Sequence, residues 1–209
     1  MRTTRIPRAG GFTVAEMAVV LLILSIAALI GFPALQKMIH RSKLEGYTRE
    51  VSILIRLARN EAVKRGVSSV VELDGDAMVA WVDVIADDDG DGVADDPPEY
   101  DPDPAAPRGT ADFEIARFVL PTGVTSRAPG ALEPIELKDD AGVDAGDILI
   151  LDPNGSSRAS GSFRFGDVRD NYLEVFIDPP ATVRVQVRKW DGADWLTPGE
   201  GGKAWEWNT

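Results

Sequence analysis

An unbroken apolar run extends from Val14 to Leu35, and Glu16 is its only charged residue. A helix over this stretch would be about 33 Å long, which is enough to cross a bilayer core of roughly 30 Å. Basic residues precede the run and acidic ones dominate the chain after it. Cytoplasmic flanks are typically the basic ones. We therefore expect a single-pass segment with the C-terminal bulk on the outer side of the membrane.

The helical pattern continues beyond the apolar run, with a change of character. Apolar residues recur at spacings of three and four, which places them on one face of a helix; they are Leu44, Tyr47, Val51, Leu54, Ile55, Ala58 and Ala62. Gly66 follows a basic last turn and is expected to end the helix. The pattern predicts one rod over residues 12–65, with a kink or weak point near Gly31 and Pro33.

After Gly66 the apolar period changes from helical to two. Strands are predicted at 67–73, 78–85, 113–120, 147–151, 162–165, 173–177 and 182–190. Asp74-Gly75-Asp76 is a hairpin-type turn. The stretch 86–111 is acidic and rich in Pro and Gly, and 121–146 is predicted to be mostly loop. The expected class is α+β, with a mainly antiparallel sheet packed on the amphipathic half of the helix.

The junction before the apolar run carries a second signal. Gly10-Gly11-Phe12-Thr13-Val14-Ala15-Glu16-Met17 follows Arg2, Arg5 and Arg8, whereas an ordinary secretory signal is cut after its apolar region. This order resembles the class III signal of type IV prepilins. The resemblance implies cleavage between Gly11 and Phe12 by a prepilin peptidase, methylation of Phe12, and pairing of Glu16 with the N-terminal amine of a neighbouring subunit. The alternative is a plain signal anchor.

The residues at the end of the predicted helix point to one group within the type IV pilin-like proteins. Residues 57–67, Leu-Ala-Arg-Asn-Glu-Ala-Val-Lys-Arg-Gly-Val, resemble the helix-to-strand signature of the GspH/FimT group of minor pseudopilins. The group implies a pilin-like fold: leader 1–11, filament-core transmembrane helix 12–35, amphipathic helix 36–66, and a β-rich periplasmic domain 67–209 with an insert at 86–111. It also implies an inner-membrane subunit of a type II secretion pseudopilus or related type IV filament. Other pseudopilins and secreted cargo would be its partners.

Composition limits the other functions. The chain has 34 acidic and 22 basic residues, so its bulk charge should not attract nucleic acid. The alternative is a FimT-like pilin that binds DNA through Arg184, Arg188 and Lys189. The chain has no cysteine, and its one histidine, His40, lies just beyond the predicted membrane segment. We therefore expect no Ser-His-Asp or Cys-His catalytic set. A carboxylate-pair hydrolase remains open, but nothing positions such a pair. We therefore expect no enzyme.

The acidic insert predicts calcium. Asp87, Asp89, Asp91 and Asp95 occupy positions 1, 3, 5 and 9 of a loop with Gly92 at position 6. Calcium takes six to eight oxygens, and the carbonyl of Val93 can supply another. The pattern resembles the short calcium loops of thrombospondin type 3 and dockerin-like repeats, with Asp96 or Glu99 as extra ligands. A solvated acidic loop is the alternative.

Four tryptophans fall in the last 20 residues: Trp190, Trp195, Trp205 and Trp207. They are expected to cover an open edge or end of the sheet. The alternatives are a partner surface, since tryptophan is enriched at interface hot spots, and a carbohydrate platform.

Overall fold

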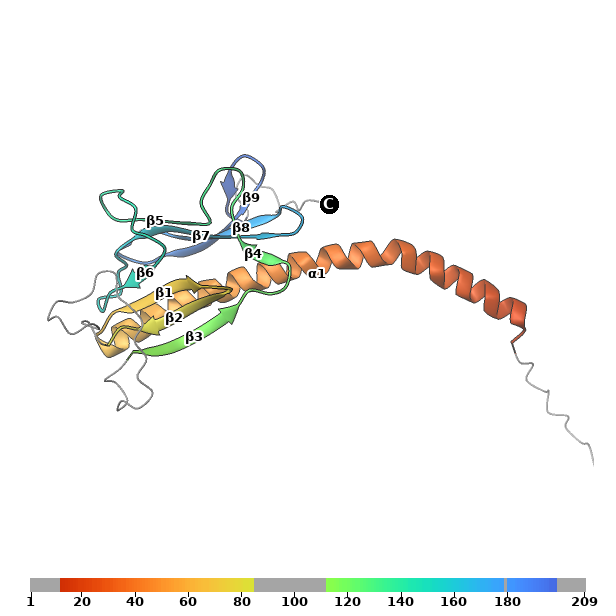
Figure 1. Cartoon of the computed structure of the whole chain (residues 1–209), viewed down its shortest axis with the longest axis horizontal. Helices are drawn as coiled ribbons and strands as arrows, with labels where there is room; N and C mark the ends of the chain where they lie inside the picture. The colour runs from red at the N-terminus through yellow and green to blue at the C-terminus, as the bar shows by residue number, and fades with distance from the viewer. Residues whose placement is uncertain (1–11, 85–111, 179, 199–209) are drawn as a thin grey trace, which may run out of the picture. The chain divides into compact units, whose positions relative to one another are not determined.

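The computed structural model describes residues 12–84, 112–178 and 180–198, apart from the side chains of Ile30, Pro33 and Ala34. The chain divides into two compact units, residues 1–39 and 40–209. Within the described residues there is one α-helix, α1, and ten strands in two antiparallel sheets (Figure 1). The expected α+β class is therefore confirmed.

Helix α1 runs without interruption from Val14 to Arg65. It passes through Gly31 and Pro33, where a kink or weak point was predicted, and it ends as predicted at Gly66. Gly66 has φ +75° and donates its N–H to the Ala62 carbonyl at 2.9 Å. That left-handed conformation is the usual reason for glycine after a helix C-terminus.

In the second unit, the helix buries the face that the apolar spacing predicts. Leu44, Tyr47, Val51, Leu54, Ile55 and Ala58 belong to one hydrophobic cluster with side chains of both sheets. The ring of Tyr47 meets that of Phe165 edge to face, with centroids 5.1 Å apart. The Tyr47 hydroxyl donates to the Phe118 carbonyl at 3.1 Å, and Ser69 Oγ donates to the Ala58 carbonyl at 2.9 Å. Burial of the Tyr47 hydroxyl raises its pKa well above the usual range.

The first sheet has the order β3-β2-β1-β6. Its strands are β1 (Ser69–Asp74), β2 (Ala77–Val82), β3 (Phe113–Val119) and β6 (Leu149–Leu151). Asp74 pairs with Ala77 across the tight β1–β2 turn, in which Gly75 takes φ +61°. At the far end of β2, Val82 is the register partner of Phe113 on β3. Each of these strands was predicted to within a few residues.

The second sheet has the order β10-β9-β8-β7-β4, and β5 also pairs with β7. The strands are β4 (Val124–Ser126), β5 (Ile135–Lys138), β7 (Ser160–Asp167), β8 (Tyr172–Ile177), β9 (Val185–Trp190) and β10 (Trp195–Leu196). The prediction of mostly loop over 121–146 was therefore incomplete, because β4 and β5 both lie there. Both are short, and each is held by hydrogen bonds to the long strand β7.

Candidate functional site

The start of α1 is a reciprocal cap made by Thr13 and Glu16. The Thr13 N–H donates to Glu16 Oε2 at 2.8 Å and the Thr13 hydroxyl donates to the same oxygen at 2.9 Å. In return, the Glu16 N–H donates to Thr13 Oγ1 at 3.2 Å. This is the capping-box arrangement, which satisfies helix N–H groups that have no partner within the helix. Glu16 itself is exposed in the isolated chain.

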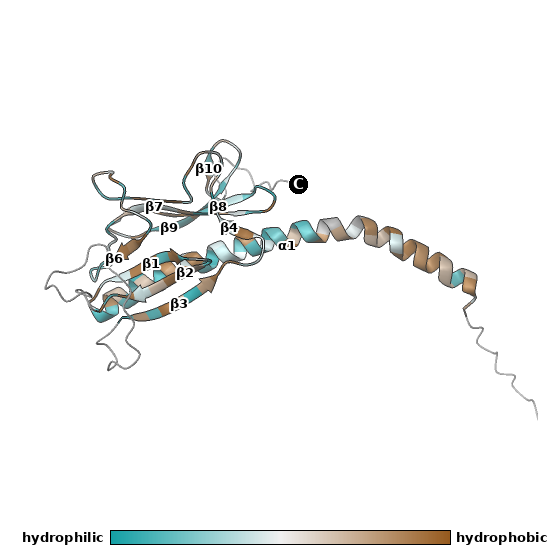
Figure 2. Cartoon of the chain, in the orientation of Figure 1, coloured by the Kyte–Doolittle hydropathy of each residue, from teal (hydrophilic) through white to brown (hydrophobic). Residues whose placement is uncertain are grey.

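The apolar side chains near this cap are exposed to solvent in the isolated chain. Val14 is 88 % exposed, and the other large apolar side chains described from Phe12 to Leu29 are exposed as well. Figure 2 shows hydrophobic colours concentrated along this first part of α1. Among the residues described, no helical stretch meets the length and hydropathy needed to cross a membrane. The predicted segment Val14–Leu35 includes Ile30, Pro33 and Ala34, whose side chains lie outside the description. Of the processing pair, Phe12 is described and exposed, and Gly11 lies outside the described residues.

The predicted calcium ligands Asp87, Asp89, Asp91, Val93 and Asp95 all lie outside the described residues. The described part of the chain brings no group of three or more His, Cys, Asp or Glu side chains together in a metal-binding arrangement. The calcium site therefore remains a prediction from sequence.

The three basic residues considered for DNA lie in different surroundings. Arg184 is exposed, but Lys189 is buried on β9. The Arg188 guanidinium lies 2.6 Å from Glu174 Oε1 and stacks on the Phe176 ring, 3.5 Å from its centroid. Of the three, only Arg184 is presented openly to solvent.

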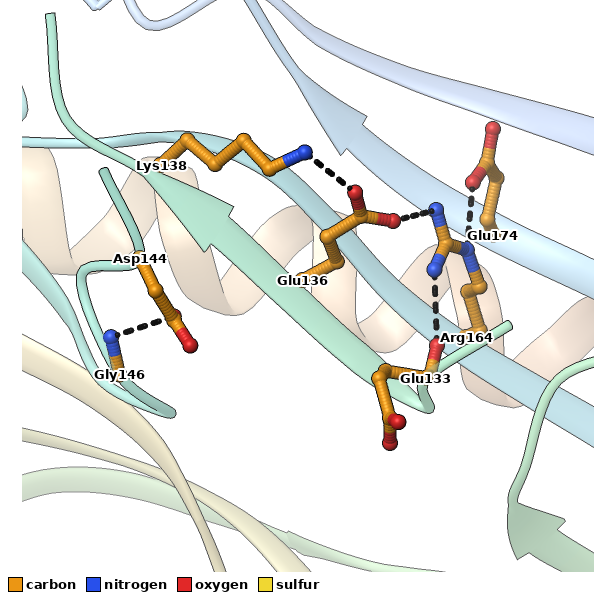
Figure 3. Close-up of polar contacts among 7 residues, drawn as sticks. All are labelled: Glu133, Glu136, Lys138, Asp144, Gly146, Arg164 and Glu174. Carbon is orange, nitrogen blue, oxygen red and sulfur yellow. Dashed lines mark hydrogen bonds and ion pairs between the residues drawn. The ribbon is translucent and has the colours of Figure 1, made fainter. Parts of the chain in front are cut away.

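Arg188 belongs to a charged ladder across the second sheet, built from Glu136 on β5, Arg164 on β7, Glu174 on β8 and Arg188 on β9. Arg164 and Glu174 are register partners, as are Glu174 and Arg188. Arg164 Nε lies 3.1 Å from Glu174, and its Nη2 lies 2.8 Å from Glu136 (Figure 3). Its Nη1 donates to the Glu133 carbonyl at 2.7 Å. The Arg164 fork therefore ties together three strands and the segment that precedes β5.

The centre of the ladder is removed from water, because the Glu174 side chain is 0 % exposed and that of Arg164 is 7 % exposed. The outer members, Glu136 and Arg188, are partly exposed. Hydrogen bonds from Lys138 and Arg164 hold the pKa of Glu136 below its ordinary value. A cavity of about 240 Å³ beside the ladder is lined in part by Ser160, Ser162 and Phe176. The charges compensate one another within the ladder, since Arg164 contacts both Glu136 and Glu174 and Arg188 contacts Glu174. Chemically, this arrangement holds strands together.

Two of the four C-terminal tryptophans are described, and they lie at the edge of the second sheet. Trp190 and Trp195 are register partners on β9 and β10, with ring centroids 5.4 Å apart. The Arg164 guanidinium lies 5.8 Å from the Trp195 ring centroid. Trp190 and Trp195 thus pack against each other on the two strands at the β10 edge of the second sheet. Trp205 and Trp207 lie outside the described residues.

Two features were missed in the sequence. The Thr-x-x-Glu pattern at 13–16 is the usual signal of a capping box, but the hydrogen bonds between Thr13 and Glu16 were not predicted. The Arg164–Glu174 pair could not be predicted from the sequence, because which residues face each other across two strands depends on their register.

Comparisons of the chain with family models, with curated proteins and with solved structures found no match.

Proposed function

We propose that this chain is a minor pseudopilin, a structural subunit of a type II secretion pseudopilus or a related type IV filament in the inner membrane. A prepilin peptidase would cut after Gly11 and leave Phe12 as the N-terminus. Residues 12–35 would anchor the subunit and later pack in the filament core. The β-rich part would lie in the periplasm, packed on the amphipathic half of α1 in the pilin-like manner.

The observation that carries this proposal is the position of Glu16. A carboxylate within an apolar segment costs free energy of insertion, though less near the end of the segment than at its centre. In the isolated chain this carboxylate faces solvent and its hydrogen-bond partners are in Thr13. Cleavage after Gly11 would create a free amine at Phe12, four residues before Glu16. A carboxylate that meets such an amine on a neighbour in a low-dielectric core fixes register more than it adds stability.

Processing tests the first half of the proposal. The intact mass of protein extracted from membranes should correspond to residues 12–209 with one methyl group. Gly11→Val should leave the leader attached. A mature N-terminus after Gly31 or later would instead mean an ordinary secretory signal and would overturn the class III interpretation.

Two substitutions at Glu16 separate its possible roles. Glu16→Gln keeps a side chain that can cap Thr13 but removes the charge, whereas Glu16→Val removes both. If assembly depends on the charge, both variants should insert normally and fail to co-purify with filament partners. If Glu16→Gln assembles like the original chain, Glu16 serves only to cap the helix and the proposed pairing is wrong.

A further inference from the structure

Along the part of α1 in the second unit, one side of the helix is not covered by the other described residues. Arg49, Ile53, Arg56, Leu57 and Asn60 recur at spacings of three and four, so they share one side of the helix. All five are exposed, with Ile53 at 57 % and Leu57 at 37 %. The face opposite is the one buried in the core cluster. We call these five residues the outer helix face.

The charge on this face is not compensated locally. Neither Arg49 nor Arg56 has an ion-pair partner among the described residues, whereas Arg65 and Lys64 in the last turn both pair with Glu61. Residues 36–66 carry eight basic and three acidic side chains, and residues 67–209 carry 11 basic and 30 acidic ones. The helix is therefore a basic element on a strongly acidic chain. An apolar patch rimmed by free arginines fits an acidic partner with an apolar centre.

The same chain presents such a surface in the loop between β5 and β6, residues 139–148. Val143 is 60 % exposed at this loop. Asp139, Asp140, Asp144 and Asp147 flank it, and none of them forms an ion pair within the part of the chain that the structure describes. The loop thus combines an exposed apolar side chain with free negative charge, which is the complement of the outer helix face.

The loop is also preorganised. The Asp139 carboxylate accepts the N–H groups of Ala141 and Val143 at 2.9 and 2.8 Å. The Asp139 N–H donates to the Val143 carbonyl at 2.9 Å, and Asp144 accepts the N–H of Gly146 at 3.0 Å (Figure 3). A loop already held in one conformation loses less entropy when it docks.

We propose that the outer helix face of one copy receives the β5–β6 loop of a second copy, with Val143 against Ile53 and Leu57 and the loop aspartates against Arg49 and Arg56. Each copy offers both surfaces, so the contact is heterologous and can continue from copy to copy; such contacts build rings or open filaments. The proposal rests on the proposed filament function. The patch is small, so the contact needs the high effective concentration that a shared membrane provides.

The absence of cysteine from the chain makes a clean test possible. Leu57→Cys and Val143→Cys are prepared as separate full-length proteins with tags of different size, mixed in membrane vesicles and oxidised. The expected product is the mixed 57–143 disulfide, in excess over the 57–57 and 143–143 products. Asn154→Cys, at another exposed loop, is the matched control and should give no mixed product with Leu57→Cys. Equal yields from 143 and 154 would overturn the proposal.

Charge reversal gives the second arm of the test. Arg56→Glu in the Leu57→Cys chain should lower the mixed yield about five- to tenfold, because an attraction becomes a repulsion. Asp140→Lys in the Val143→Cys chain should restore it. If neither Arg56→Glu nor Asp140→Lys changes the yield of the mixed disulfide, the two cysteines meet by random collision, and this result would also overturn the proposal. The two proposals can fail separately. If the chain is processed after Gly11 and assembles in a Glu16-dependent way but gives no 57–143 disulfide, the docking contact is wrong and the pseudopilin function is still supported.

Discussion

Arg164 and Glu174 face each other as register partners on β7 and β8, and the arginine Nε lies 3.1 Å from the buried carboxylate. Arg188 reaches the same carboxylate from β9 at 2.6 Å. Glu174 therefore keeps two cations compensated on one face of the second sheet, and three neighbouring strands depend on one side chain.

Replacing Glu174 should be costly. Glu174→Ala leaves both arginines without their shared partner, and removing one member of a buried pair typically costs about 3–5 kcal/mol. Glu114→Ala is the matched control, since it removes the carboxylate that pairs with Arg117 at the surface and should cost about 0–1 kcal/mol. Urea denaturation of the full-length protein in mild detergent measures both. A cost for Glu174→Ala no larger than for Glu114→Ala would show that the ladder is not stabilising.

Glu136 should make stability depend on pH. Its folded pKa lies below the ordinary value of 4.5 because Lys138 and Arg164 favour the charged form. A depressed folded pKa means a contribution that is present above the unfolded pKa and is lost as pH falls through the folded one. Glu136→Gln should therefore lower stability at neutral pH and flatten its decline below about pH 4.5. Glu133→Gln should keep the original profile, since only the Glu133 backbone carbonyl contacts Arg164.

Adjacent positions on α1 provide a sharp contrast in burial. Leu54 is fully buried and Ile53 is 57 % exposed. Leu54→Ala should cost about 2–5 kcal/mol through lost burial and the cavity it leaves, whereas Ile53→Ala should stay within about 0.5 kcal/mol. Equal costs for the two would mean that the helix packs through a different face.

Replacing two glycines by alanine should change the stability of the protein in opposite directions. At Gly161, with φ +149°, a Cβ would lie 1.9 Å from the Glu136 carbonyl oxygen, so Gly161→Ala should break the β5–β7 pairing. At Gly46, inside α1, a Cβ meets nothing within 4 Å, and Gly46→Ala should stabilise the protein by about 0.5–1 kcal/mol. The thermal unfolding temperature should fall for Gly161→Ala and rise for Gly46→Ala. Unchanged stability in Gly161→Ala would rule out the tight β5–β7 contact.

The sequence alone specified the helix and most strands, because their apolar periods are strong and local. The end of α1 followed from Gly66, and the β1–β2 turn from Gly75. By contrast, β4 and β5 were missed because each is only a few residues long and becomes a strand by pairing with β7. The Arg164 fork was missed for a related reason, since its partners come from other strands. The assembly role of Glu16 stays a prediction, and its hydrogen bonds with Thr13 were overlooked although the Thr-x-x-Glu spacing reveals them.

The calcium prediction has a direct measurement. Asp87, Asp89, Asp91, the Val93 carbonyl and Asp95 should bind one ion, with affinity near the 10⁻⁴–10⁻³ M that is typical of extracellular modules. Calorimetric titration of the full-length protein in detergent should show binding heat that Asp89→Ala abolishes while its far-UV spectrum stays unchanged. Millimolar calcium with no heat and no change in proteolysis of residues 86–111 would identify the insert as a solvated linker.

The pairing of Val82 with Phe113 places the two ends of the β2–β3 connection on neighbouring, hydrogen-bonded strands. Closing a flexible loop costs free energy that grows slowly with length, about 0.6 kcal/mol for each doubling. The β2–β3 connection is therefore a suitable site for insertions and deletions. A short turn could replace it, or a small reporter domain could be spliced into it, while the strands on either side keep their register.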